Sequence, residues 1–118
     1  MAQGLVIDAH HHYMPKEIGN LLYQEAQGKR RLVNERISIT LTEKWFDIDT
    51  HLRDMDAGGI DMALLNMSGI SVLGLEACRL LNDATARVVK EHPDRFVGCA
   101  HTAVHEGEGA LEALIRGV

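Results

Sequence analysis

The sequence predicts an α/β fold whose strands pair in parallel. Three short apolar segments of strand length alternate with longer amphipathic segments of helical spacing. A chain that alternates strand and helix in this way forms a parallel sheet, because each helix returns the chain to the start of the next strand. No internal repeat, low-complexity tract or linker divides the 118 residues, so we expect a single domain over residues 1–118.

The first unit carries an insertion. Residues 5–7, "LVI", are a short apolar run that predicts a fully buried strand leading into a polar block. Residues 16–27 have apolar side chains at helical spacing and end at Gly28, a residue typical of helix ends. Residues 37–42 then alternate apolar and hydroxyl side chains, which predicts a half-exposed strand in a hairpin that turns near residues 34–35.

The second and third units are more regular, because helix caps and breakers mark their boundaries. An aspartate precedes the second helix, paired glycines follow it, and a proline follows the third helix. The expected elements are a helix from Asp47 or Asp49 to residues 58–59, a strand over 60–67, a helix over 75–91, a strand over 96–100 and a helix from residue 106.

The composition argues against nucleic acid and membranes as partners. Aromatic residues are 4% of the chain and the formal net charge is −5, so stacking platforms are few and no basic face offsets the acidic balance. No run of 18 apolar residues and no signal-like N-terminal segment is present. Cys78 and Cys99 lack metal or disulfide spacing, which indicates free thiols. We therefore expect a soluble, cytoplasmic protein.

Three consecutive histidines follow the first apolar run. Side chains alternate faces along a strand, so His10 and His12 point to one side and His11 to the other. Two imidazoles on one side of a strand end can bind one divalent metal ion, for which zinc is the expected choice. Asp8 has the same parity and is a candidate for fixing the tautomer of one imidazole.

The triplet has two other interpretations, a tag remnant and a solvated strand end. A tag remnant is disfavoured, because tags are longer and do not follow a buried-strand pattern. Three solvated polar residues at a strand end stay a fair alternative. The position favours the metal interpretation, because α/β folds place their active sites at the C-terminal ends of parallel strands.

Residues 7–15, "IDAHHHYMP", resemble the D-x-H-x-H-x-x-P signature of amidohydrolase-superfamily enzymes of the aminocarboxymuconate-semialdehyde decarboxylase type. The signature falls here on Asp8, His10, His12 and Pro15. Two later stretches are also similar to the family, and the resemblance is weakest over residues 20–44. These stretches are "HLRDMDAGGIDMALL" (51–65) and "LLNDATARVVKEHPDRFVGCA" (80–100).

The resemblance implies a (β/α)8 barrel that holds one divalent metal, usually zinc. It also implies hydrolysis or non-oxidative decarboxylation of small carboxylic acids, and it transfers the metal-ligand role to His10 and His12 only. Such a barrel needs about 250 residues, so three units form roughly its first three-eighths. In the family the remaining ligands come from later strands. We therefore expect a truncated N-terminal part with little or no turnover of its own.

Further polar residues follow the later strands. His101 is a candidate ligand, acid or substrate contact, although a polar strand-end residue near solvent is the favoured interpretation. Asn66 and Ser68 can donate hydrogen bonds to a substrate, and an ordinary loop start is equally consistent with them. His51 and His92 are interpreted as surface residues, and Trp45 as a packing residue at the start of the second helix.

Two hypotheses follow from these observations. The first is the N-terminal part of a metal-dependent hydrolase or decarboxylase, a lyase or hydrolase that acts on a small-molecule carboxylate. The second is a non-catalytic, truncated α/β domain that self-associates or complements a missing C-terminal part. A three-stranded parallel arc leaves one face and its edges open, so we expect a homo-oligomer in either case.

Overall fold

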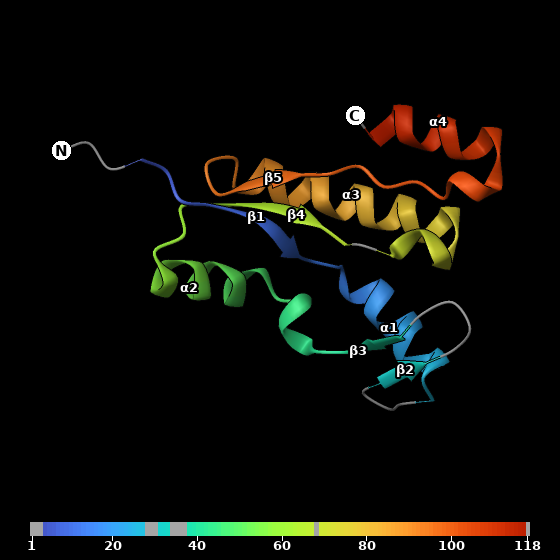
Figure 1. Cartoon of the computed structure of the whole chain (residues 1–118), viewed down its shortest axis with the longest axis horizontal. Helices are drawn as coiled ribbons and strands as arrows, with labels where there is room; N and C mark the ends of the chain where they lie inside the picture. The colour runs from blue at the N-terminus through green and yellow to red at the C-terminus, as the bar shows by residue number, and fades with distance from the viewer. Residues whose placement is uncertain (1–3, 28–30, 34–37, 68, 118) are drawn as a thin grey trace.

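The structure is a computed structural model that describes residues 4–27, 31–33, 38–67 and 69–117. Its strands and helices alternate as predicted (Figure 1). In chain order they are β1 (Ile7–His12), α1 (Lys16–Glu25), β2 (Arg31–Val33), β3 (Ser38–Thr40), α2 (Ile48–Gly58), β4 (Met62–Asn66), α3 (Leu75–Glu91), β5 (Phe96–Gly98) and α4 (Glu108–Gly117). None of the described helices is long and apolar enough to span a bilayer.

Strands β1, β4 and β5 form a parallel sheet in that spatial order, which is also their order along the chain. The α/β class and the parallel pairing are therefore confirmed. A sheet wound in one direction matches an arc of a barrel, whereas a doubly wound sheet reverses its strand order. The insertion after α1 is an antiparallel pair of β2 and β3. Its predicted turn at residues 34–35 lies outside the described residues.

Helix boundaries follow local capping chemistry. The side chain of Asp47 accepts a hydrogen bond from the backbone N–H of Asp49, so Asp47 is the residue that caps α2. Gly59 ends this helix with a φ of 70°, a left-handed conformation that favours glycine. The third helix ends just before Pro93, as predicted. These caps fix where β4 and β5 begin, and therefore which residues reach the far end of the sheet.

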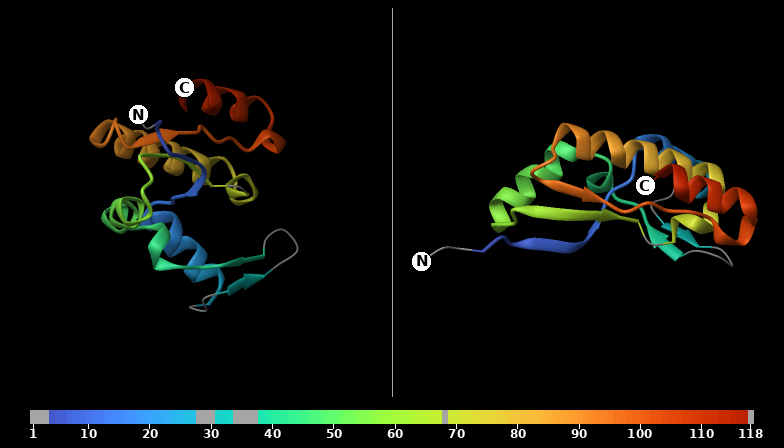
Figure 2. Two further views of the ribbon diagram at one scale, coloured as in Figure 1. Left: turned by 60° about the vertical axis from the view of Figure 1, so that its left-hand side comes forward. Right: turned by 90° about the horizontal axis from the view of Figure 1, so that it is seen from above.

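Helices α2 and α3 lie on one side of the sheet (right-hand view of Figure 2). Ala63, Leu65 and Phe96 point to this side and are buried against Met55 of α2 and Val88 of α3. We call this side the helix-covered face. Each of these apolar side chains leaves water on packing, which is the main favourable contribution to the docking of the helices.

The other side of the sheet, the bare face, has no helix over it in the described part of the chain (Figure 2). Residues paired in register on neighbouring strands point to the same face. The pairs on the bare face are Ile7 with Met62, Leu64 with Val97, and His12 with Asn66.

The prediction of a fully buried first strand is wrong. Leu5 is 70% exposed, Val6 52% and Ile7 57%. The reason is that β1 is the edge strand of the sheet and that one face of the sheet is uncovered. The apolar run therefore has the composition of a barrel strand without the neighbours that would bury it.

Candidate metal centre

A β-bulge interrupts β1 just where the histidines begin. From Asp8 to His11 the strand advances three residues, while its partner β4 advances only two, from Ala63 to Leu65. A bulge adds one unpaired residue and breaks the simple alternation of faces. Asp8 and His11 consequently both point to the helix-covered face, while His12 points to the bare face.

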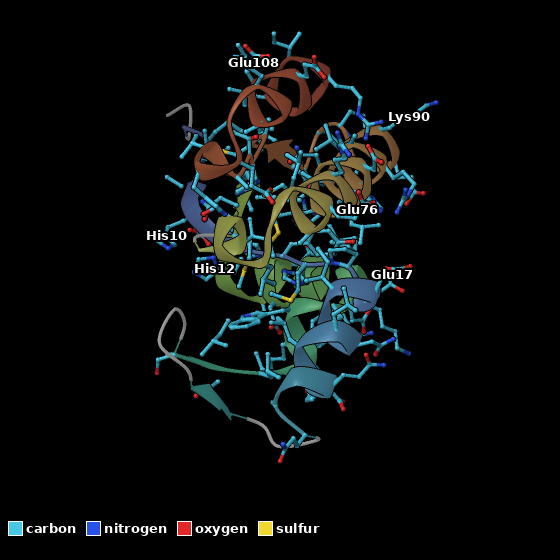
Figure 3. The ribbon with its side chains drawn as sticks, turned by 90° about the vertical axis from the view of Figure 1, so that its right-hand side faces the viewer. His10, His12, Glu17, Glu76, Lys90 and Glu108 are labelled. Atoms are coloured by element: carbon cyan, nitrogen blue, oxygen red, sulfur yellow. The ribbon has the colours of Figure 1, made fainter. Side chains whose placement is uncertain are left out.

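The imidazoles of His10 and His12 converge. Their Nε2 atoms lie 3.2 Å apart, and their ring centroids are 4.8 Å apart with the rings at 80°. Figure 3 shows the two labelled side chains close together. His10 is exposed and His12 is half-buried, so neither ring is sealed in an apolar interior. The two side chains therefore share one side of the strand end, as the sequence predicts.

The pair fits a divalent metal ion. Two ring nitrogens bound at about 2.0–2.1 Å to one tetrahedral ion lie about 3.3 Å apart. The Nδ1–H of His12 donates a hydrogen bond to the backbone carbonyl of Asn66, at 3.2 Å. This bond places the proton of His12 on Nδ1, so its Nε2 carries the lone pair, as in metal-binding histidines generally. In the metal-free chain that lone pair accepts a hydrogen bond from Nε2–H of His10, which a metal ion would replace.

Two histidines do not complete a catalytic metal site. Within residues 4–27, 31–33, 38–67 and 69–117, no group of three or more histidine, cysteine, aspartate or glutamate side chains can hold an ion. A catalytic zinc centre generally has three protein ligands and an open position for water. The described residues therefore provide a pair of candidate ligands, and two ligands by themselves give a weak and exchangeable site.

Asp8 does not orient either ring of the pair. Its Oδ2 accepts a hydrogen bond from Nδ1–H of His11 at 2.9 Å, and its Oδ1 accepts one from the backbone N–H of His10 at 3.1 Å. The first of these bonds, reinforced by the second, holds the pKa of the Asp8 carboxyl below its usual value. The sequence expectation for Asp8 is corrected, because the bulge turns this side chain toward the helices. The backbone carbonyl of Asn66, and not Asp8, accepts the hydrogen bond that fixes the tautomer of His12.

His51 is a functional candidate that sequence reasoning missed. It is predicted to be a surface residue, yet it is only 7% exposed, and its Nδ1 lies 2.6 Å from Nε2 of His11. Burial, followed by the charge of His11, lowers the pKa of His51. One signal was available in the sequence: His51 lies three residues after Ile48 and four before Met55, on the apolar stripe of α2.

His101 links the ends of two strands. Its Nε2 accepts a hydrogen bond from the backbone N–H of Met67 at 3.1 Å, and its backbone is held by two hydrogen bonds of 2.8 Å to the Asn82 side chain. Burial lowers the pKa of His101, which favours the neutral ring that this bond requires. The Nε2 lone pair is therefore already engaged. The ring is half-buried rather than solvated.

Of the remaining candidates, Asn66 and Trp45 lie beside His12. The side-chain Oδ1 of Asn66 is buried and has no hydrogen-bond partner among the described residues. Trp45 is partly buried against the core, as predicted, and its ring also approaches the edge of His12 with centroids 6.2 Å apart. Ser68, the other predicted substrate contact, lies outside the described residues. His92, predicted to be at the surface, is half-buried and contacts the ring of Phe96.

Comparison with known proteins confirms the resemblance to the amidohydrolase-type decarboxylases. The chain is 23% identical to 2-amino-3-carboxymuconate-6-semialdehyde decarboxylase of Dictyostelium discoideum, over 97% of this chain and 37% of that protein. No protein-family profile matches the sequence.

Solved structures show the same fold over nearly the whole chain. A 5-carboxyvanillate decarboxylase from Sphingomonas paucimobilis superposes with a TM-score of 0.73 at 19% identity, over 96% of this chain and 39% of that one. A 5-carboxyvanillate decarboxylase from Novosphingobium aromaticivorans, solved with manganese and a substituted nitrobenzoic acid, gives 0.72 at 26% identity, over 96% and 38%. The chain thus spans less than two-fifths of the length of these relatives.

Proposed function

We propose that this chain, which resembles the amidohydrolase-type decarboxylases over nearly its whole length, is the N-terminal part of a metal-dependent decarboxylase or hydrolase. In this proposal it forms roughly the first three-eighths of a (β/α)8 barrel, and His10 and His12 hold a divalent metal. The observation that carries the proposal is the 3.2 Å separation of the two Nε2 atoms at the C-terminal end of β1. Barrel enzymes build their active sites at this end of the strands.

The substrate class of the proposal is a small carboxylic acid. The Novosphingobium relative was solved with manganese and a substituted nitrobenzoic acid, which supports an aromatic acid. A bound divalent ion supplies Lewis acidity, which polarises a carboxylate or activates a water molecule. The residues of this chain contribute position: the Asn66 carbonyl holds the tautomer of His12, and the open bare face leaves both Nε2 atoms accessible.

The proposed ion is zinc, with manganese as the competing choice. Imidazole ligands suit zinc well, whereas carboxylate and water ligands suit manganese. The two ligands on this chain are both imidazoles, and this supports zinc. The manganese in the Novosphingobium relative supports the other ion. Competition between the two ions for the wild-type chain therefore distinguishes them.

The Asn66 amide is the proposed substrate contact. Its Oδ1 is buried without a partner in the described part of the chain, while the backbone of the same residue bonds to His12. Buried polar atoms without a partner are rare in native proteins, so this oxygen keeps an unused acceptor beside the proposed metal. The proposal requires that ligand binding expose it to a hydroxyl or carboxyl group.

Metal titration tests the proposal. Isothermal calorimetry with Zn²⁺ should show one ion per wild-type chain, and the double variant His10→Ala, His12→Ala should weaken binding by more than about tenfold. A double variant of histidines away from the pair, His92→Ala with His105→Ala, is the matched control and should bind as the wild type does. Equal binding by the wild type and the His10, His12 variant would refute the metal role.

The exposed bare face favours the second candidate function, a domain that assembles through its open sheet. Apolar side chains at Ile7 and Val97 are 57% and 47% exposed on one surface. Apolar side chains exposed together on one sheet face are typical of an interaction site. A homo-oligomer formed through this face would bury them, with or without catalysis.

A further inference from the structure

Behind the metal-binding pair, a chain of hydrogen bonds joins Asp8, His11 and His51, and we call it the Asp8–His11–His51 chain. The Asp8 carboxylate accepts the Nδ1–H of His11 at 2.9 Å, and Nε2 of His11 lies 2.6 Å from Nδ1 of His51. The rings of the two histidines are tilted by 53° with centroids 4.9 Å apart. All three side chains lie on the helix-covered face, opposite the proposed metal.

This chain of hydrogen bonds fixes the residue that stands between the two proposed ligands. His11 is bonded at both ring nitrogens, to a partner on its own strand and to a partner on α2. A side chain held at two points also fixes the orientation of its own backbone. His12 follows the bulge and points opposite to His11, so holding His11 toward α2 directs His12 toward the bare face, where the ring of His10 meets it.

The bulge makes such a restraint useful. A bulge leaves one residue unpaired, so sheet hydrogen bonds alone fix this part of β1 less firmly than the rest. The edge position of β1 adds to this freedom, because neighbours pair with it on one side only. The Asp8–His11–His51 chain supplies contacts from outside the sheet at this point.

The environment of His51 indicates that this histidine has a role that an apolar residue at the same position could not fill. The side chain is 93% buried within an otherwise apolar stripe, and its Nε2 has no hydrogen-bond partner among the described residues. An apolar residue of similar size would avoid the buried, unpaired nitrogen. The hydrogen bond that His51 makes to His11, at 2.6 Å, is an interaction that an apolar residue cannot make.

We propose that His51 is a positioning residue, which acts through His11 to hold the His10 and His12 imidazoles together on the bare face. The predicted effect of His51 on metal affinity rests on the proposed function. The predicted effect on the contact between the His10 and His12 rings does not rest on it, because that contact is measured in the metal-free chain.

The first test measures geometry in the metal-free chain by NMR. The wild type should show a scalar coupling across the hydrogen bond between Nε2 of His11 and Nδ1 of His51, and nuclear Overhauser contacts between the rings of His10 and His12. Absence of either signal in the folded wild type overturns the inference, and this result needs no variant to fold.

The second test uses two substitutions of the same residue. His51→Leu keeps the volume and removes the hydrogen bond, whereas His51→Asn keeps a polar group near the position of Nδ1. The His10–His12 contacts should disappear in His51→Leu and persist in His51→Asn. His92→Leu, which changes a half-buried histidine elsewhere, is the control and should keep them. Contacts that persist in His51→Leu, or that vanish equally in both variants, would show that His51 serves packing alone.

A parallel Zn²⁺ titration separates this inference from the proposed function. At a temperature where circular dichroism shows each variant folded, His51→Leu should bind about tenfold more weakly than the wild type, and His51→Asn nearly as well as the wild type. A wild-type chain that binds no zinc refutes the proposed function, and the NMR contacts then decide the positioning role on their own. Wild-type zinc affinity in His51→Leu overturns the positioning role.

Discussion

His10 and His12 bring their Nε2 atoms to within 3.2 Å of each other at the end of β1, on the face of the sheet that no described helix covers. His11, between them, faces the opposite way and bonds to His51 of α2. The three histidines therefore have two different surroundings. His10 and His12 lie on the open face, where a metal ion can reach them, whereas His11 faces the helices and holds the strand in place.

The stability of the chain should decrease as the solution is acidified. Burial lowers the pKa of both His51 and His101 in the folded state, below the unfolded value of about 6.5. The unfolded chain therefore binds more protons, so the free energy of unfolding is highest above about pH 7 and falls as the pH drops through and below about 6.5. Urea denaturation at pH 7.5 and pH 5.5 measures the difference.

Two substitutions should remove much of this pH dependence. The variant His51→Asn, His101→Gln lacks both titrating rings and keeps polar groups in their places. Its free energy of unfolding should vary less between the two pH values than that of the wild type. The charges of His11 and Asp54 also act on His51. Any pH dependence left in the variant is therefore assigned to these and other titratable groups that the variant keeps. A slope unchanged from the wild type would show that neither ring controls the effect.

Asn82→Leu should destabilise the chain. The amide of Asn82 makes two hydrogen bonds of 2.8 Å to the backbone of His101, and loss of both leaves buried backbone groups unpaired. The expected loss is about 1–3 kcal/mol in the free energy of unfolding. Urea denaturation at constant pH gives the value, and a change of less than a few tenths of a kcal/mol would contradict the assigned role.

Asn66→Leu is the matched substitution with the opposite expectation. The Oδ1 of Asn66 has no partner in the described part of the chain, so its replacement by a similar apolar volume should leave stability unchanged or raise it by up to about 1 kcal/mol. The backbone carbonyl that holds His12 remains in the variant. Zinc affinity should therefore stay close to that of the wild type. A marked loss of affinity would contradict the claim that Asn66 supports His12 through its backbone carbonyl alone.

Self-association should depend on the bare face. Ile7→Lys with Val97→Lys places two charges on that face and should shift any oligomer toward monomer in sedimentation velocity. Leu111→Lys is the control, because Leu111 is also an exposed apolar residue, at 59%, but lies on α4. An oligomer that responds to Leu111→Lys and not to the double variant would place the interface elsewhere.

Sequence patterns predicted the architecture and the histidine pair, because both depend on local periodicity. The alternation of apolar and amphipathic segments gave the parallel sheet, and the spacing of His10 and His12 gave their common side. The burial of Leu5, Val6 and Ile7 was predicted wrongly, because apolar composition does not reveal whether neighbours exist to cover a strand. The metal, the barrel fraction and the substrate stay predictions.

The parts of the site that escaped prediction depend on non-local contacts. The residue types at positions 8–11 do not indicate a β-bulge. The sequence therefore does not predict that Asp8 points to the helix-covered face. The partner of His11 is 40 residues away, and histidine is intermediate between the buried and the exposed residue types, so its identity alone does not indicate burial. Its place on the apolar stripe of α2 was the usable signal, because a polar side chain within such a stripe needs a buried partner.

X-ray absorption spectroscopy of the zinc-loaded chain tests the central claim most directly. We expect two imidazole nitrogens at about 2.0–2.1 Å from the ion, with the other positions filled by light atoms from solvent. The imidazole signal should fall by half in His10→Ala or His12→Ala and stay unchanged in the control His105→Ala. A spectrum without imidazole scattering, or one that keeps the full imidazole signal in both His10→Ala and His12→Ala, would contradict the account.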